Sequence, residues 1–224
     1  MSLAHYILGI GDRYTSNTLV DLKSCTAVGI DFGHAFGTAT QFLPVPELTP
    51  FRMTPLMAGL TVPKVSPSGG IVHATMLKTL EALQENQEAL MNILQVFLRE
   101  PVIDWVEFAN RQVHAMRRAG NLDEHLDDTK LSWYPQQKLN CVKRNLNGGN
   151  PMLLMKSEEL DLNSLVMKDS ASLLRIIIGE KGSERWSMQN EISLNTDQQV
   201  TCLIDQATDP NILGRSWIGW SPFA

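Results

Sequence analysis

Cysteine is scarce in this chain of 224 residues: Cys25, Cys141 and Cys202 lie far apart, with no Cys-x-x-Cys spacing. This scarcity argues against a disulfide framework or a zinc site and favours thiols in a reducing compartment. No apolar run approaches the roughly 20 residues that a membrane-spanning helix needs. The start, Met1–Ala4, lacks the basic region of a signal peptide. We therefore expect a cytosolic or nuclear protein with no membrane partner.

An excess of positive charge is also missing. Lys and Arg number 19 against 24 Asp and Glu, which gives a net charge of −5. Surfaces that bind nucleic acid by themselves usually carry a basic patch, so any contact with DNA is left to other parts of the molecule. The 43% of hydrophobic residues is typical of a globular protein, and the length allows one or two domains.

The first half of the sequence predicts one short hairpin within a mainly α fold. Ala27–Phe32 has the composition of a strand that leads into glycine, and Leu19–Cys25 is its expected partner, with the turn near Ser24. The segment 37–67 is rich in proline, which lacks a backbone donor and interrupts helices. An ordered loop with short helical turns is expected there.

Helical periodicity dominates the remainder. Apolar residues at intervals near three and four predict two helices within 71–98, separated around residues 85–87. A further helix is expected from Pro101 toward Arg118, and another over Lys138–Leu146. Thr196 is the expected cap of a last helix, with a buried face made by Val200, Leu203, Ile204 and Ala207.

Two polar motifs flank the expected hairpin, Gly11–Asn17 before it and Asp31–Gly33 after it. In protein kinases a loop aspartate accepts the substrate hydroxyl proton, and an asparagine five residues later binds magnesium. The aspartate of Asp-Phe-Gly then holds magnesium against the phosphates. Asp12, Asn17 and Asp31 have this order and spacing. A single Asp–Asn pair is usually a turn former, but together the motifs favour a kinase.

Three stretches resemble the catalytic and activation loops of the phosphatidylinositol 3-kinase-like protein kinases: Ile7–Arg13, Gly29–Gly37 and Pro46–Arg52. The block Gln199–Phe223 is similar to the FATC domain that closes proteins of this family. The resemblance implies a mainly α (α+β) protein-kinase-like C-terminal lobe with a short catalytic hairpin, followed by a FATC helical tail.

The same resemblance implies a division of the chain into three parts. Residues 1–118 are expected to form the kinase C-lobe, with the catalytic loop at 9–17 and the activation segment at 31–55. A connecting or regulatory region over 119–192 precedes a FATC domain at 193–224. The sequence contains no glycine-rich phosphate loop and no strand lysine with its partner glutamate. Since these belong to the N-terminal lobe, we expect that lobe to be absent and this chain alone to be inactive.

Carried over position by position, the resemblance implies that Asp12 is the catalytic aspartate, with Arg13 and Tyr14 beside it. Asn17 and Asp31 would bind Mg²⁺, with ATP as the substrate. Tyr14 replaces the loop histidine of the family, and a phenol carries no positive charge near neutral pH. If that histidine neutralises developing charge, transfer is slower here.

Four more residues belong to the implied activation loop: Phe32, Gly33, His34 and Arg52. His34 is expected to shape the loop by a hydrogen bond or to sense the phosphates. Arg52 either meets the substrate or the catalytic aspartate, or anchors the loop to the C-lobe. At the other end of the chain, Trp217 and Trp220 are expected to pack against the kinase lobe.

Gly37–Glu47, Trp133–Lys138 and Asp205–Arg215 resemble a family member that acts at DNA ends. This implies a nuclear serine/threonine kinase that joins the Ku heterodimer at DNA ends and acts in non-homologous end joining. Its protein substrates would carry Ser or Thr followed by Gln. Two alternatives stay open: another member of the same family, or a non-catalytic scaffold fragment.

Overall fold

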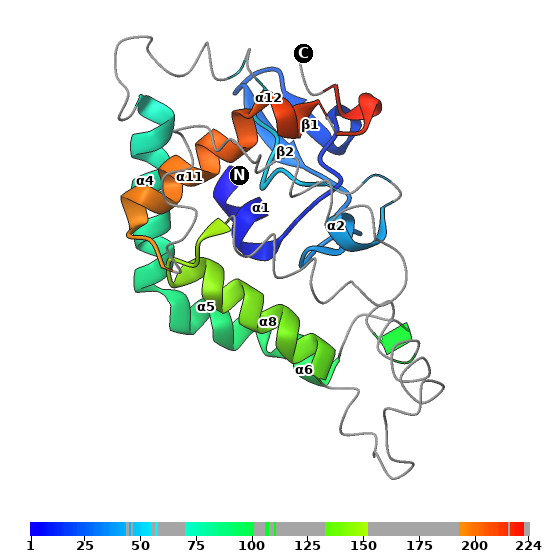
Figure 1. Ribbon diagram of the computed structural model, residues 1–224, viewed down its shortest axis with the longest axis vertical. Coiled ribbons are helices and arrows are strands. Elements are labelled where there is room, and N and C mark those ends of the chain that lie inside the picture. The colour runs from blue at the N-terminus through cyan, green and yellow to red at the C-terminus, as the bar shows by residue number, and fades with distance from the viewer. Residues whose placement is uncertain are drawn as a thin grey trace.

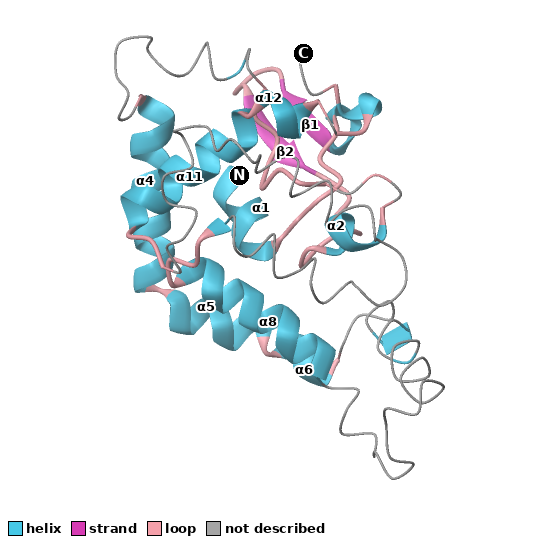
Figure 2. Ribbon diagram, in the orientation of Figure 1, coloured by secondary structure: helices cyan, strands magenta, loops and turns pink. Residues whose placement is uncertain are grey.

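The computed structural model describes the greater part of the two ends of the chain and two stretches between them. The described residues are 1–43, 45, 47–54, 57, 70–100, 106–107, 110, 133–151, 193–214 and 216–221. Within them the fold is mainly helical with one two-stranded antiparallel sheet (Figure 1). Figure 2 shows this hairpin in magenta among the helices of the described residues, which confirms the expected mainly α (α+β) class.

Helices form most of the described elements, and the hairpin follows the first of them. The elements are α1 (Ser2–Leu8), η1 (Thr15–Asn17), β1 (Thr18–Asp21), β2 (Thr26–Gly29), α2 (Thr38–Phe42), α4 (Ile71–Glu85), α5 (Gln87–Leu94), α6 (Val96–Arg99), α8 (Trp133–Leu146), α11 (Thr196–Thr208), α12 (Pro210–Leu213) and η4 (Ile218–Trp220).

The hairpin lies where the sequence predicts it, with Thr18 opposite Gly29 and Asp21 opposite Thr26. Ser24 closes the turn by donating a 2.6 Å hydrogen bond to the Asp21 carboxylate. β2 is shorter than the predicted strand because the chain turns away at Asp31, whose φ is 56°. The hairpin thus ends next to the Asp-Phe-Gly motif.

Helix α1 lies in the middle of the molecule and packs against α4 and α8 (Figure 1). Its Leu3, Tyr6 and Ile7 are buried. The helix ends at Gly9, which has a left-handed φ of 56°. A Cβ at Gly9 would lie 2.6 Å from the backbone nitrogen of Gly37, so the close approach of the two loops requires glycine here.

Helices α4 and α5 are separated at Asn86, which confirms the predicted break. α11 lies alongside α4 (Figure 1), and Thr196 Oγ1 donates a 3.0 Å bond to Gln84 Oε1. Leu80 of α4 and Leu203 of α11 are fully buried. Each such leucine stabilises the fold by about 1.5–3 kcal/mol.

The cap of α11 differs from the prediction. Asn195 Oδ1 accepts a 2.8 Å bond from the Gln198 N–H, and Gln198 Oε1 accepts a 3.0 Å bond from the Asn195 N–H. Asn195 is therefore the cap of a complete capping box, and the assignment of the cap to Thr196 is wrong by one residue. The predicted buried face is confirmed at Val200, Leu203 and Ala207, while Ile204 is half-buried.

Two further helix predictions are tested only in part by the described residues. α8 begins at Trp133, five residues before the predicted start at Lys138. The helix expected from Pro101 to Arg118 lies mostly outside the described residues. No helix in the described part of the chain is both long and apolar enough to cross a bilayer.

Candidate active site

The loop between α1 and η1 brings Asp12 and Asn17 together. Asp12 has a left-handed φ of 57°, a conformation that Asp and Asn tolerate better than most residues. The Asn17 side-chain amide donates a 2.7 Å bond to the Asp12 carbonyl and lies 3.4 Å from its carboxylate Oδ2. Asn17 is buried and Asp12 is half-buried. The loop therefore holds Asp12 in a half-buried position at the protein surface.

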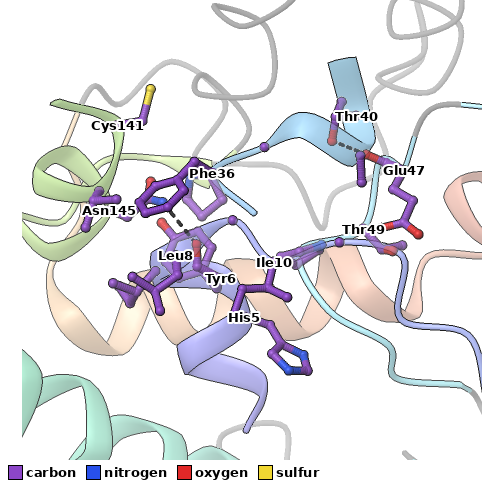
Figure 3. Close-up of a pocket in the computed structure, with 18 of the residues that line it drawn as sticks. His5, Tyr6, Leu8, Ile10, Phe36, Thr40, Glu47, Thr49, Cys141 and Asn145 are labelled. Carbon is purple, nitrogen blue, oxygen red and sulfur yellow. Dashed lines mark hydrogen bonds between the residues drawn. The ribbon is translucent and has the colours of Figure 1, made fainter. Parts of the chain in front are cut away.

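Glu47, which the sequence does not mark as a site residue, binds the other side of Asp12. Its Oε2 accepts a 2.8 Å bond from the Asp12 N–H. The Glu47 carbonyl accepts a 2.6 Å bond from Thr40 Oγ1 (Figure 3). Burial raises the pKa of the Glu47 carboxyl to about 7, against the lowering effect of the Asp12 N–H.

The hairpin register places Asp31 next to Asn17. The Ile30 N–H donates a 3.0 Å bond to the Asn17 carbonyl, so Asp31 follows one residue beyond the last backbone pair. Asp31 is exposed, and its Oδ1 accepts a 3.3 Å bond from the Gly33 N–H. The three predicted residues Asp12, Asn17 and Asp31 thus lie on adjoining segments of one loop system.

Arg13 ties the two loops together. Its side chain is 2% exposed, and its Nε donates a 2.7 Å bond to the Gly11 carbonyl. The Nη1 group donates a 2.7 Å bond to the Ile30 carbonyl, and Nη2 donates to the Asp31 carbonyl. The guanidinium carbon lies 5.3 Å from the ring centre of the exposed Phe32. Because these donors point at main-chain carbonyls, Arg13 acts through the positions of its neighbours.

Tyr14 contacts the C-terminal turn. Its ring meets that of Trp217 edge-on, with centroids 5.9 Å apart and planes at 89°. Tyr14 is half-buried, and Trp217 is 51% exposed. Aromatic pairs favour this geometry because the positive ring edge faces the negative ring face. Trp217 therefore packs against the loop between α1 and η1, in agreement with the expected packing against the kinase lobe.

Arg52 and His34 both make structural contacts. Arg52 Nη2 donates a 3.0 Å bond to the Ser221 carbonyl, and its guanidinium lies 5.6 Å from the ring of Trp220. Burial lowers the pKa of Arg52. His34 Nδ1 lies 3.5 Å from Thr38 Oγ1, and its carbonyl accepts a 2.8 Å bond from the N–H of Gly11. Arg52 thus contacts the C-terminal turn at Ser221 and Trp220, and its expected roles toward the substrate, the catalytic aspartate or the C-lobe stay predictions.

A cavity of about 110 Å³ is lined by residues of α1 and the loop after it, of α8 and of the segment 36–50 (Figure 3). Gln199 of α11 donates from Nε2 to the Tyr6 hydroxyl at 3.0 Å and to the Asn145 carbonyl at 2.8 Å. Burial raises the pKa of Tyr6. Burial, followed by the charge of Arg13, lowers the pKa of His5 to about 4. The His5 ring and the Tyr6 hydroxyl therefore stay neutral near pH 7. Gln199 supports α1 through its bond to the Tyr6 hydroxyl.

The chemistry of Asn17 and Asp31 fits a magnesium ion that is shared with a nucleotide. The Asn17 Nδ2 group is directed at Asp12, which leaves the amide oxygen of Asn17 as a possible metal ligand, and Asp31 offers an exposed carboxylate. Mg²⁺ prefers oxygen ligands and usually takes one or two from protein and the rest from phosphates and water. The described residues contain no group of three or more His, Cys, Asp or Glu that could hold a metal alone.

Comparisons with known proteins find similar sequences along the whole chain. Residues 1–107 match the phosphatidylinositol 3- and 4-kinase family, and residues 193–224 match the FATC domain. The DNA-dependent protein kinase catalytic subunit of Canis lupus familiaris is 42% identical over 226 residues, covering 100% of this chain. That of Xenopus laevis is 41% identical over 223 residues, also covering 100%. The chain spans 5% of the length of each of these two proteins.

A solved structure, the FAT and kinase domain of CtTel1, has the same fold with a TM-score of 0.55 and 22% identity. The match covers 100% of this chain and 11% of the solved chain. Fold and matches together define the C-terminal region of a kinase domain that ends in a FATC domain. The chain belongs to the phosphatidylinositol 3-kinase-like protein kinase family.

Proposed function

We propose that the protein carrying this chain transfers the γ-phosphate of ATP to serine or threonine hydroxyls of proteins. One observation supports this above all: Asp12 is bonded to Asn17, five residues away, and Asp31 follows the last backbone pair of the same hairpin. This order of an aspartate, an asparagine and a second aspartate is the one that kinases use.

Each of these residues receives a role from its surroundings. Asp12 orients the substrate hydroxyl and accepts its proton. Asn17 and Asp31 hold Mg²⁺, which neutralises charge on the phosphates when it is bound. Arg13 keeps Asp31 next to the catalytic loop through its main-chain bonds. The Tyr14 hydroxyl can donate a hydrogen bond but brings no positive charge.

The finer function is taken from the relatives, whose name describes a DNA-dependent kinase. We propose activation by DNA ends, association with the Ku heterodimer, a nuclear location and a role in non-homologous end joining. Substrates would carry Ser or Thr followed by Gln. The proposed division is a C-lobe at 1–118, a connecting region at 119–192 and a FATC domain at 193–224. The identity of about 40% along the chain supports this member over others.

A non-catalytic scaffold is the second candidate, and Tyr14 is the observation that favours it. An aromatic side chain that packs edge-on against Trp217 serves packing as well as catalysis. Against it stands the combination of Asp12, Asn17 and Asp31, because a scaffold needs no complete set of oxygen ligands.

The test is phosphate transfer by the intact protein, captured through this C-terminus. A Ser-Gln peptide and Mg-ATP are supplied, with and without linear DNA and Ku. We expect transfer that rises with DNA ends, that is lost in Asp31→Asn and that is unchanged in Asp197→Asn, a change at an exposed carboxylate of α11. Transfer that is indifferent to DNA would favour another member of the family. No transfer by the wild-type protein would favour the scaffold.

A further inference from the structure

Asp12 is held through both of its main-chain polar groups by residues from different segments. Its carbonyl accepts from Asn17 at 2.7 Å, and its N–H donates to Glu47 at 2.8 Å. With the peptide groups on both sides fixed, the direction of the Asp12 side chain follows from its left-handed φ of 57°. Such a conformation persists where surrounding contacts stabilise it. Loss of either contact frees the backbone to relax and turns the carboxylate away.

Glu47 is itself held in place for this contact. Thr40 Oγ1 donates to its carbonyl at 2.6 Å (Figure 3), and the next carbonyl, that of Leu48, accepts a 3.3 Å bond from Gln206 of α11. Gly11 leaves space for the carboxylate, since a Cβ there would overlap the Ala39 Cβ and come within 2.7 Å of Glu47 Oε2. Thr40 and Gln206 thus hold the backbone at Glu47 and Leu48, and Gly11 leaves room for the Glu47 carboxylate.

We propose that Glu47 is a positioning residue for the catalytic aspartate, which it aims by accepting the Asp12 N–H. The inference rests on the proposed kinase function, because it gives Glu47 a task within that site. It also makes the activation segment a direct support of the catalytic loop, so a segment displaced at Glu47 releases Asp12.

The groups around Glu47 indicate that its side chain acts as a hydrogen-bond acceptor rather than as a fixed charge. Asp12 and Arg13 face it from the catalytic loop, while His5 of α1 and Lys138 of α8 line the same cavity. Burial raises its pKa to about 7, so both protonation states occur near neutral pH, and each keeps an acceptor oxygen. Glutamine keeps such an oxygen in a side chain of the same size, whereas alanine does not.

The kinetic test compares Glu47→Ala with Glu47→Gln in the intact protein. Because a misplaced catalytic group slows the chemical step, Glu47→Ala should lower kcat roughly 10- to 100-fold. The KM for ATP should stay near the wild-type value, and Glu47→Gln should recover most of the kcat. Glu88→Ala, at an exposed carboxylate of α5, is the matched control and should leave kcat unchanged. Wild-type kcat in Glu47→Ala, or equal losses in both variants, would overturn the proposal.

Hydrogen exchange at the Asp12 amide separates this inference from the proposed function. The amide should exchange slowly in the wild-type protein and in Glu47→Gln, and faster in Glu47→Ala. If the wild-type protein transfers no phosphate, the kinase function fails while the exchange rates still decide the contact. Equal exchange at Asp12 in all three proteins would overturn the role of Glu47 whatever the activity.

Discussion

Replacing Arg13 by alanine should loosen the catalytic loop from the Asp-Phe-Gly segment. The guanidinium is 2% exposed and donates to the carbonyls of Gly11, Ile30 and Asp31. Alanine removes all three donors at once. A lysine at this position can supply a charge, but its compact ammonium group does not span two loops as a planar fork does.

The free-energy cost of Arg13→Ala depends on whether water can replace the lost donors at the three carbonyls. A buried polar group left without its partner costs about 1–3 kcal/mol. Gly11 is buried, whereas Ile30 and Asp31 are exposed residues, so water can reach the last two carbonyls more easily. The local opening free energy should therefore fall by roughly 3 kcal/mol, at the lower end of the sum. Because 1.4 kcal/mol corresponds to a factor of ten, this is an increase of about 100-fold in the open population.

Hydrogen exchange of the Gly11 and Ile30 amides measures this opening. Their N–H groups donate to His34 and Asn17 across the two loops at 2.8 and 3.0 Å. Exchange should accelerate about 100-fold in Arg13→Ala and less in Arg13→Lys. Lys23→Ala, at the exposed hairpin turn, is the control. A change below about threefold at both amides in Arg13→Ala would refute the view that Arg13 joins these loops.

Further predictions concern the residues around this loop. Tyr14→His should raise kcat because a protonated imidazole adds positive charge near the phosphates; an unchanged or lower kcat would show that the phenol suffices. Trp217→Ala should speed exchange of the catalytic-loop amides by roughly 2- to 10-fold, while Trp217→Phe retains an aromatic edge and slow exchange. The raised pKa of Glu47, from 4.5 to about 7, makes stability fall as pH rises through that range. The lowered pKa of His5, from 6.5 to about 4, makes stability fall as pH drops through its range. The two slopes oppose each other, so Glu47→Gln should leave a stability that rises between pH 4 and 6.5, measured by hydrogen exchange; a flat profile would contradict this.

The sequence predicts those features that rest on local patterns. The hairpin could be located because β-branched residues and a polar turn lie within a dozen positions. The break at Asn86 follows from a polar interruption in an apolar helical stripe. The order of Asp12, Asn17 and Asp31 is likewise a local signal, since kinase chemistry fixes the spacing of these residues along the chain.

Contacts between distant segments could not be predicted in this way. Glu47 binds Asp12 across 35 residues, and Gln199 binds Tyr6 across 193. Glutamate and glutamine are mostly surface residues, so residue type alone does not mark Glu47 or Gln199 as buried. Their burial arises when helices pack. The cap at Asn195 was missed for another reason: Asn195 and Thr196 are both good caps. Gln198, three residues after Asn195, completes the capping box and was the signal that distinguishes them.

The FATC segment is part of the same hydrophobic core as the kinase lobe. Val200, Leu203 and Ala207 of α11 are fully buried and belong to one cluster with Ile7 of α1 and Leu80 of α4. Removing α11 would expose the partners of these side chains, and a buried leucine alone accounts for about 1.5–3 kcal/mol. The FATC match therefore begins at residue 193, but this position is not a boundary between two folding units.

The tail also reaches the site itself, from three places along its length. Trp217 meets the ring of Tyr14, Gln206 donates to Leu48, and the Ser221 carbonyl accepts from Arg52. Tyr14 lies in the loop between α1 and η1, whereas Leu48 and Arg52 lie on either side of Pro50. α11 is fixed in the core and supplies Gln206 to the contact with Leu48, whereas the other two contacts come from the chain beyond α12. The packing of α11 thus helps to hold the segment that carries Glu47, the residue that accepts from the Asp12 N–H.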